Sequence, residues 1–296
     1  MTIFLLLIPD FALILLGSAL RRYAGFADAF WEGLERLVYF VLFPSMLFFA
    51  VARSHIDFAA MGPLFLAGVL AMAVGLLLGL LAKPWMGLDG LQFASRVQCA
   101  FRFNTYIAMA VAGKLHGAAG ITMMGVLCGV MAPIANLAAV SLLARHGQGG
   151  VLREILRNPL IIATVLGLLC NVAGVTVPVP LAALLTRLSD ASIALGLLAV
   201  GAALKWGSPG GHSFGLVWLV GVKLMLLPLA AWFFVPWLGL TGLPRDMAVL
   251  FAALPTASSA YILAMRMGGD GTGVAWLISA TTVLSVFSMT FWLSLL

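Results

Sequence analysis

Apolar residues in this chain gather into long runs that are separated by short polar segments. The runs are long enough for helices of about 20 residues, the length that the hydrocarbon core of a bilayer requires. The alternation at every second residue that is typical of membrane-spanning strands is missing. The pattern predicts ten membrane-spanning helices, near residues 3–20, 33–52, 60–82, 93–113, 119–144, 159–177, 181–204, 214–237, 246–266 and 272–295.

Two of the predicted helices, the fourth and the ninth, carry polar residues near the middle of the membrane. In the ninth, Pro255 removes a backbone donor and clashes with the preceding turn. In the fourth, Asn104 and Thr105 can bond to the local backbone and disturb the helix. We therefore expect both helices to be broken at mid-membrane. A structural kink without any site remains the alternative, since such kinks are common in membrane proteins.

The two halves of the chain repeat several features in the same order. Leu34-x-Arg36-Leu37 opens the second predicted span, and Leu185-x-Arg187-Leu188 opens the seventh. Tyr106-Ile107-Ala108 in the fourth span matches Tyr261-Ile262-Leu263 in the ninth. Because five spans is an odd number, the second copy enters the membrane from the opposite side.

We therefore expect an all-α membrane protein with ten transmembrane helices, built as a 5+5 inverted repeat with broken crossover helices 4 and 9. Its predicted parts are a first five-helix repeat, a cytoplasmic connecting loop and a second five-helix repeat, at 1–144, 145–158 and 159–296.

Composition supports a membrane protein. Hydrophobic residues make up 63% of the chain and charged residues only 9%, against about 25% charged residues in soluble domains. The net charge of +6 comes from basic residues between the apolar runs, so the positive-inside rule explains it better than nucleic-acid binding does. That rule predicts cytoplasmic odd-numbered loops and periplasmic termini. We expect the protein to lie in the inner (plasma) membrane.

Arg102 points to the chemistry of a possible transport site. A charged residue at mid-membrane is costly, so it should face protein or water. The N-termini of broken helices add partial positive charge, which favours an anionic ligand. A structural role for Arg102, bonded to a carbonyl or a carboxylate, is the alternative. We expect the substrate-binding residues to be Arg102, Asn104, Thr105, Tyr106, Asn136, Lys223, Pro255, Thr256, Ser258 and Ser259.

Other polar residues in the spans allow more than one interpretation. Lys223 either meets a substrate carboxylate, or pairs with Asp190, or extends to the interface. Asp190 is the candidate for proton coupling, although a plain ion pair with Arg187 is its alternative. Asn136 lines the site or serves as packing glue. Asp10 is expected near the interface. The histidines fall at span ends or in loops, where we expect them to be solvated: His55, His116, His146 and His212.

Several motifs resemble the auxin efflux carrier family, and the bacterial branch in particular. They are Phe101-Arg102-Phe103-Asn104-Thr105-Tyr106-Ile107, Ala253-Leu254-Pro255-Thr256-Ala257 with Ala260-Tyr261, and Phe43-Pro44. Plant members have an Asn-Pro pair at each crossover, whereas this chain keeps only Asn104 in one and only Pro255 in the other. The resemblance implies a fold like that of the bile-acid, arsenite and riboflavin transporters. It also implies a homodimer in which spans one, two, six and seven form a scaffold.

The resemblance further implies elevator-type transport of malonate-like and malate-like dicarboxylates. We therefore predict a secondary carrier of small organic anions, working in the lipid bilayer without a metal or other cofactor. A sodium- or proton-coupled carrier like the bile-acid symporters and an exporter of indole acids remain alternatives. An intramembrane enzyme is disfavoured, because no His-Glu-x-x-His or Gly-x-Ser-x-Gly motif occurs. A channel is a further alternative.

Overall fold

The computed structural model describes residues 3–53, 58–144, 159–205, 213–257 and 259–296, and every regular element in these ranges is helical. Six described segments are long and apolar enough to cross a membrane, and they are Asp28–Ala52, Met61–Leu80, Gly90–Leu143, Val179–Ala202, Ser213–Trp237 and Gly271–Ser294. The chain is thus an all-helical protein with several membrane-crossing segments. The predicted connecting loop at 145–158 lies outside the described residues.

The first half contains α1 (Ile3–Tyr23), α2 (Asp28–Leu37), η1 (Val38–Leu42), α3 (Phe43–Ala52), α4 (Phe58–Leu80), α5 (Lys83–Met86), α6 (Gly90–Val97), η2 (Gln98–Ala100) and α7 (Thr105–Ala144). The second half contains α9 (Pro159–Val172), α10 (Val179–Ala202), α11 (Ser213–Gly221), η3 (Val222–Leu226), α12 (Leu227–Trp237), α13 (Gly242–Ala253), α14 (Ser259–Arg266) and α15 (Gly271–Ser294). Here η1 and η3 are π-helical, and η2 is a 3₁₀ turn.

Prolines explain the π-helical segments. The segment η3 runs directly into Pro228, the second residue of α12. A proline has no N–H for the carbonyl four residues before it, which here belongs to Leu224. The indole Nε1–H of Trp292 in α15 donates to that carbonyl at 3.1 Å. The local widening of the helix is therefore tolerated in the membrane interior because a neighbouring helix satisfies the freed carbonyl.

The helix α7 contains a sharp turn. His116 and Gly117 have non-helical backbone angles, with φ of −136° and 58°. Glycine tolerates the positive φ because it has no Cβ. The turn divides α7 into a short first part, which ends at Leu115, and a long second part.

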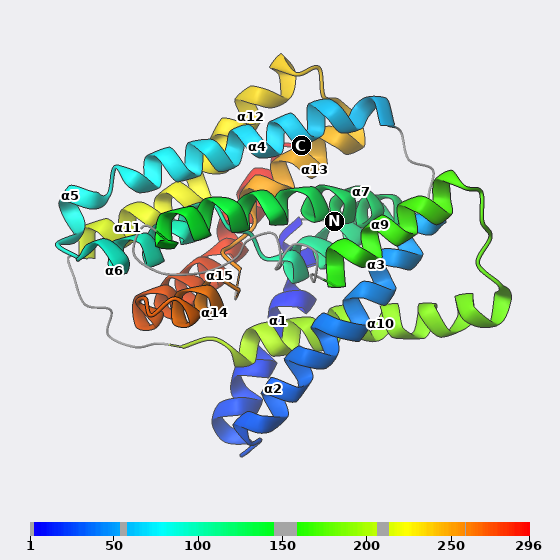
Figure 1. Cartoon of the computed structure of the whole chain (residues 1–296), viewed down its shortest axis with the longest axis horizontal. Helices are drawn as coiled ribbons and strands as arrows, with labels where there is room; N and C mark the ends of the chain where they lie inside the picture. Colours follow the sequence, from blue (N-terminus) through cyan, green and yellow to red (C-terminus); the bar gives the residue numbers. More distant parts are fainter. Residues whose placement is uncertain (1–2, 54–57, 145–158, 206–212, 258) are drawn as a thin grey trace.

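The described helices pack as two groups (Figure 1). In the first, here called the α10 group, α10 packs on α1, α2 and α3, and α3 packs on α9. In the second, the α13 group, α13 packs on α4, α7, α12 and α15, and α14 packs on α15. Contacts of α7 with α3 and α10, and of α15 with α1, join the two groups.

Small residues bring the helices of the α10 group close together. A Cβ built on Gly201 of α10 would collide with the backbone carbonyl of Ile14 in α1. One on Gly196 would lie 2.9 Å from the ring of Phe43 in α3. The side chain of Ser192 is fully buried and donates to Met46 Sδ at 3.2 Å. Close helix contact through small residues is the common way to pack helices in lipid.

Candidate functional site

Two non-helical segments meet inside the α13 group. The chain is non-helical at Phe101–Asn104, between η2 and α7, and again after α13, from Leu254 to Ala257. The backbone N–H of Asn104 donates to the carbonyl oxygen of Pro255 at 2.9 Å. The two segments that the sequence singled out are therefore in direct backbone contact.

Asn104 also starts the helix α7. Its Oδ1 atom accepts hydrogen bonds from the backbone N–H groups of Tyr106 at 3.0 Å and Ile107 at 3.2 Å. These are the second and third residues of the helix, so Asn104 is an N-cap. The Nδ2 atom of Asn104 is buried and has no hydrogen-bond partner among the described residues. The side chain thus fixes the helix start with one atom and leaves a donor available beside the break.

Thr256 links the second non-helical segment to η2 and to α15. Its hydroxyl donates to the carbonyl oxygen of Cys99 at 2.7 Å, and its own N–H donates to Thr281 Oγ1 of α15 at 3.3 Å. Because the last carbonyls of a helix lack intrahelical partners, the Thr256 hydroxyl satisfies one of those that end η2. Thr256 has no exposed surface. In this conformation it supports the breaks.

Arg102 lies at the centre of a polar cluster. Its Nη2 atom donates to Asn136 Oδ1 at 2.8 Å and to Ser259 Oγ at 3.0 Å, and Nη1 donates to Gln98 Oε1 at 3.4 Å. Arg102 is 6% exposed, whereas Ser259 is exposed. Residues from both broken segments and from the second part of α7 therefore surround one buried guanidinium, with Ser259 on its accessible side.

Lys223 is a second buried cation. It lies in η3, a π-helical segment that contacts η2, α13 and α15, and it is 1% exposed. Among the residues that the structure describes, no carboxylate forms an ion pair with its ammonium group, and Asp190 is exposed on α10. Neither the expected pairing with Asp190 nor extension to the interface is seen. Lys223 instead lies buried in a segment that contacts η2 and α13, the two helices that end at the breaks.

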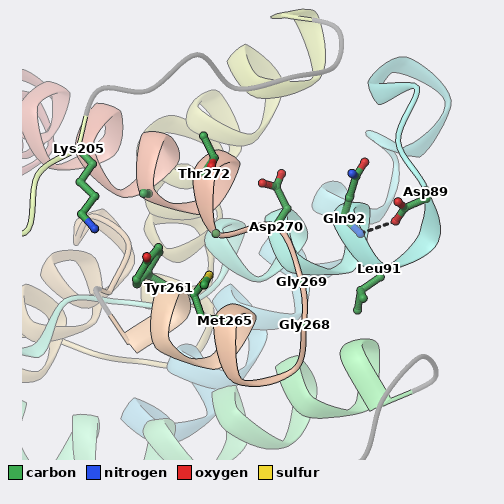
Figure 2. A pocket seen from close by; sticks show the side chains of 12 residues that line it. Asp89, Leu91, Gln92, Lys205, Tyr261, Met265, Gly268, Gly269, Asp270 and Thr272 are labelled. Atoms are coloured by element: carbon green, nitrogen blue, oxygen red, sulfur yellow. Dashed lines mark hydrogen bonds between the residues drawn. The ribbon is translucent and has the colours of Figure 1, made fainter.

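A cleft opens between α6, α14 and α15, with one lining residue from the segment that follows α10 (Figure 2). Its volume is about 690 Å³, and its walls include the start of α6, the end of α14 and the start of α15. Lys205, which follows α10, stands over the ring of Tyr261 with its Nζ atom 5.0 Å from the ring centre. A smaller cavity of about 190 Å³ shares Lys205 and Tyr261 and reaches Glu35 of α2. Tyr261 and Met265 of α14 line the cleft, and Ser259, the first residue of the same helix, contacts Arg102.

Asp270, one of the residues that line this cleft, forms a buried ion pair with Arg96. Arg96 Nε of α6 lies 2.6 Å from Asp270 Oδ2, and their side chains are 3% and 13% exposed. The other oxygen of Asp270 accepts from the N–H of Gly273 at 2.9 Å and caps α15. The N–H of Asp270 donates to Ser95 Oγ at 3.1 Å. The ion pair therefore links α6, which precedes the non-helical segment Phe101–Asn104, to α15, which follows the non-helical segment after α13 and the helix α14.

The structure brings most of the expected site residues together. Around the two breaks lie Arg102, Asn104, Asn136, Pro255, Thr256 and Ser259, with Thr105 at the start of α7. The ring of Tyr106 packs on Phe43 of α3, with centroids 4.5 Å apart, at the contact between the groups. Asp190 lies apart on the exposed side of α10, and Ser258 lies outside the described residues.

Sequence reasoning missed several residues near the site. Lys205 and Tyr261 line the cleft, and Arg96 pairs with Asp270, although none of the four was expected in a site. Arg96 gave a signal, since it is a charged residue in the same apolar stretch as Arg102. His116, which was expected to be solvated, is 31% exposed in its side chain, and its Nε2 atom also lies 2.8 Å from Asp246 Oδ2.

Comparison with known proteins gives a consistent result. A family model described as "Membrane transport protein" matches residues 143–293. An "Uncharacterized transporter" of Methanothermobacter thermautotrophicus is 27% identical over 289 residues, which are 95% of this chain and 94% of that protein. A "Putative malonate transporter" of Rhizobium meliloti is 23% identical over 305 residues, covering 96% of this chain and 93% of that protein.

Proposed function

Because this chain belongs to the auxin efflux carrier family of membrane transport proteins, we propose that it is a secondary carrier of small organic anions. Dicarboxylates of the malonate and malate type are the proposed substrates. The distant relative from Rhizobium meliloti, named as a putative malonate transporter, supports this class. Since homologues and family are transporters, the chain is not an enzyme.

The observation that carries the proposal is that two basic side chains, Arg102 and Lys223, are buried in the elements around the breaks. Arg102 and Lys223 are 6% and 1% exposed, and both lie in apolar membrane-crossing segments. A buried charge is costly unless an opposite charge or hydrogen bonds compensate it. Arg102 donates hydrogen bonds to Asn136, Ser259 and Gln98, and Ser259 is exposed. A dicarboxylate in this region would supply negative charge to both cations.

The two helix groups support an elevator mechanism. We assign the α10 group as the fixed scaffold and dimer surface, and the α13 group as the moving part that carries the breaks. The breaks would be the crossing points of a 5+5 inverted repeat at 1–144 and 159–296. The cleft between α6, α14 and α15 would be the substrate entrance in the present conformation.

The distribution of basic residues supports an orientation in the inner membrane. Arg21 lines the smaller cavity, and Lys205 lines both the cleft and the smaller cavity. By the positive-inside rule their end of the helices is cytoplasmic, which puts both termini in the periplasm. The cleft would then open to the cytoplasm.

Uptake of radiolabelled malonate into proteoliposomes tests the proposal. Wild-type protein should accumulate label, and Arg102→Ala should abolish uptake because the buried charge beside Ser259 is gone. Arg22→Ala is the matched control, since Arg22 is exposed at the end of α1, and it should transport normally. Equal uptake by Arg102→Ala and wild type would disprove the assignment of Arg102. Transport of indole-3-acetate in place of malonate would overturn the substrate class.

A further inference from the structure

Asp10 is a carboxylate buried in the helical bundle, although the sequence placed it near the interface. It follows Pro9 in α1 and is 5% exposed. Its Oδ1 atom forms an ion pair with Lys114 Nζ at 2.7 Å. The Oδ2 atom is buried and has no hydrogen-bond partner within the described ranges. Lys114 is therefore the one cation seen to compensate this carboxylate in the part of the chain that the structure describes.

The ion pair joins the two helix groups. Asp10 belongs to α1 of the α10 group, and Lys114 lies in the last turn of the first part of α7, in the α13 group, just before the bend at Gly117. The side chain of Lys114 is 29% exposed, so water reaches this side of the pair. His116 contacts Asp246 at the start of α13, whereas the cleft lies at the far end of α14. The pair thus links the two groups at a place away from the residues that line the cleft.

The charged groups around Asp10 are few. The helices packed on α1 are α7, α10 and α15. From α7 come Lys114 and His116, and His116 is held by Asp246, which also pairs with Arg245 at 3.0 Å. The charged residues of α10, namely Arg187 and Asp190, are exposed, and those of α1 are Arg21 and Arg22 in its last turn. The sequence of α15 contains no charged residue and no histidine.

We propose that Asp10 is a proton-binding site that is ionised while Lys114 pairs with it and takes up a proton when the α13 group moves away. The inference rests on the proposed carrier function. Removing one partner of a buried ion pair leaves an uncompensated charge, and a carboxylate in that position neutralises instead. The proton comes from the water beside Lys114. A lower pH on that face of the membrane therefore favours the conformation in which the two groups have separated.

Infrared spectroscopy of the purified protein tests proton binding without any substrate. Acidification should produce the C=O band of a protonated carboxyl group in wild type, and part of this band should be missing in Asp10→Asn. The Lys114→Met protein should show the Asp10 band already at neutral pH, because its counter-charge is gone. The band is assigned by comparison with the double variant that also carries Asp10→Asn. Absence of the band in Lys114→Met at neutral pH would overturn the proposal.

Transport measurements then test whether proton binding by Asp10 is part of the transport cycle. Exchange of labelled malonate in proteoliposomes should depend on the pH at the Lys114 face in wild type and in Asp190→Asn, and this dependence should be lost in Asp10→Asn. Asp10→Glu, which keeps a carboxyl group, should retain it. An unchanged pH profile in Asp10→Asn, or no pH dependence in wild type, contradicts the link. Failure of wild type to carry malonate at all contradicts the proposed function, and the infrared experiment still decides whether Asp10 binds the proton.

Discussion

The N–H of Asn104 donates to the carbonyl oxygen of Pro255 at 2.9 Å and joins the two halves of the chain at their non-helical segments. The two residues have different roles in this contact. Asn104 supplies a backbone donor and caps a helix, whereas Pro255 has no N–H and offers its carbonyl. The break in each half is therefore completed by the other half.

Replacing Asn104 by alanine should weaken this arrangement. The variant loses the oxygen that accepts from Tyr106 and Ile107, and loss of such a cap costs about 1 kcal/mol. We expect a lower Tm in detergent and slower malonate exchange with the same preference for anions. Asn104→Asp keeps the cap oxygen, so its Tm should lie nearer to that of wild type. An unchanged Tm in Asn104→Ala would show that the cap adds nothing to stability.

Replacing Lys223 by methionine should weaken transport without lowering the stability of the protein. Methionine has a similar length and removes a buried charge for which the described residues provide no ion-pair partner. Removing a buried charge that lacks a compensating partner also removes its desolvation cost. We expect a Tm equal to or above that of wild type together with weaker malonate uptake. A large fall in Tm would instead identify Lys223 as a structural cation.

Replacing Asp270 by asparagine should strongly lower the stability of the protein, because it breaks the ion pair between α6 and the start of α15. Its partner Arg96 is 3% exposed in its side chain, and breaking a buried ion pair costs on the order of 3 kcal/mol. The control is Asp28→Asn, because Asp28 pairs with Arg21 at 2.6 Å but its side chain is 76% exposed. Exposed pairs contribute about 0–1 kcal/mol. Equal changes in Tm for the two variants would contradict the importance of burial.

Gly201→Ala should separate α1 from α10. The added Cβ would collide with the carbonyl group of Ile14, and overpacking of this kind costs about 1–3 kcal/mol. Gly33→Ala in α2 is the control, because no atom lies within 4 Å of a Cβ at that position. There alanine should be neutral or should stabilise the helix by up to about 1 kcal/mol. Thermal unfolding of both variants in the same detergent measures the difference.

The sequence determined the helical character of the chain and the residues that are costly in lipid. Apolar runs of membrane-spanning length leave helices as the solution, because every backbone group in lipid must find a partner within its own segment. Arg102, Asn104 and Pro255 stood out because each conflicts with an uninterrupted apolar helix. Their positions gave the non-helical segments, and their chemistry gave the expectation of an anion.

Only the tertiary structure decided which charged side chains pair with one another. The sequence suggested Asp190 as one possible partner of Lys223 and gave no partner for Asp10 or His116. The structure instead pairs Asp10 with Lys114, and His116 with Asp246. Hydrophobic periodicity tells which face of a helix is apolar but not which distant helix covers it. In a bundle of apolar helices, the partner of each rare charge therefore depends on packing between segments far apart in the chain.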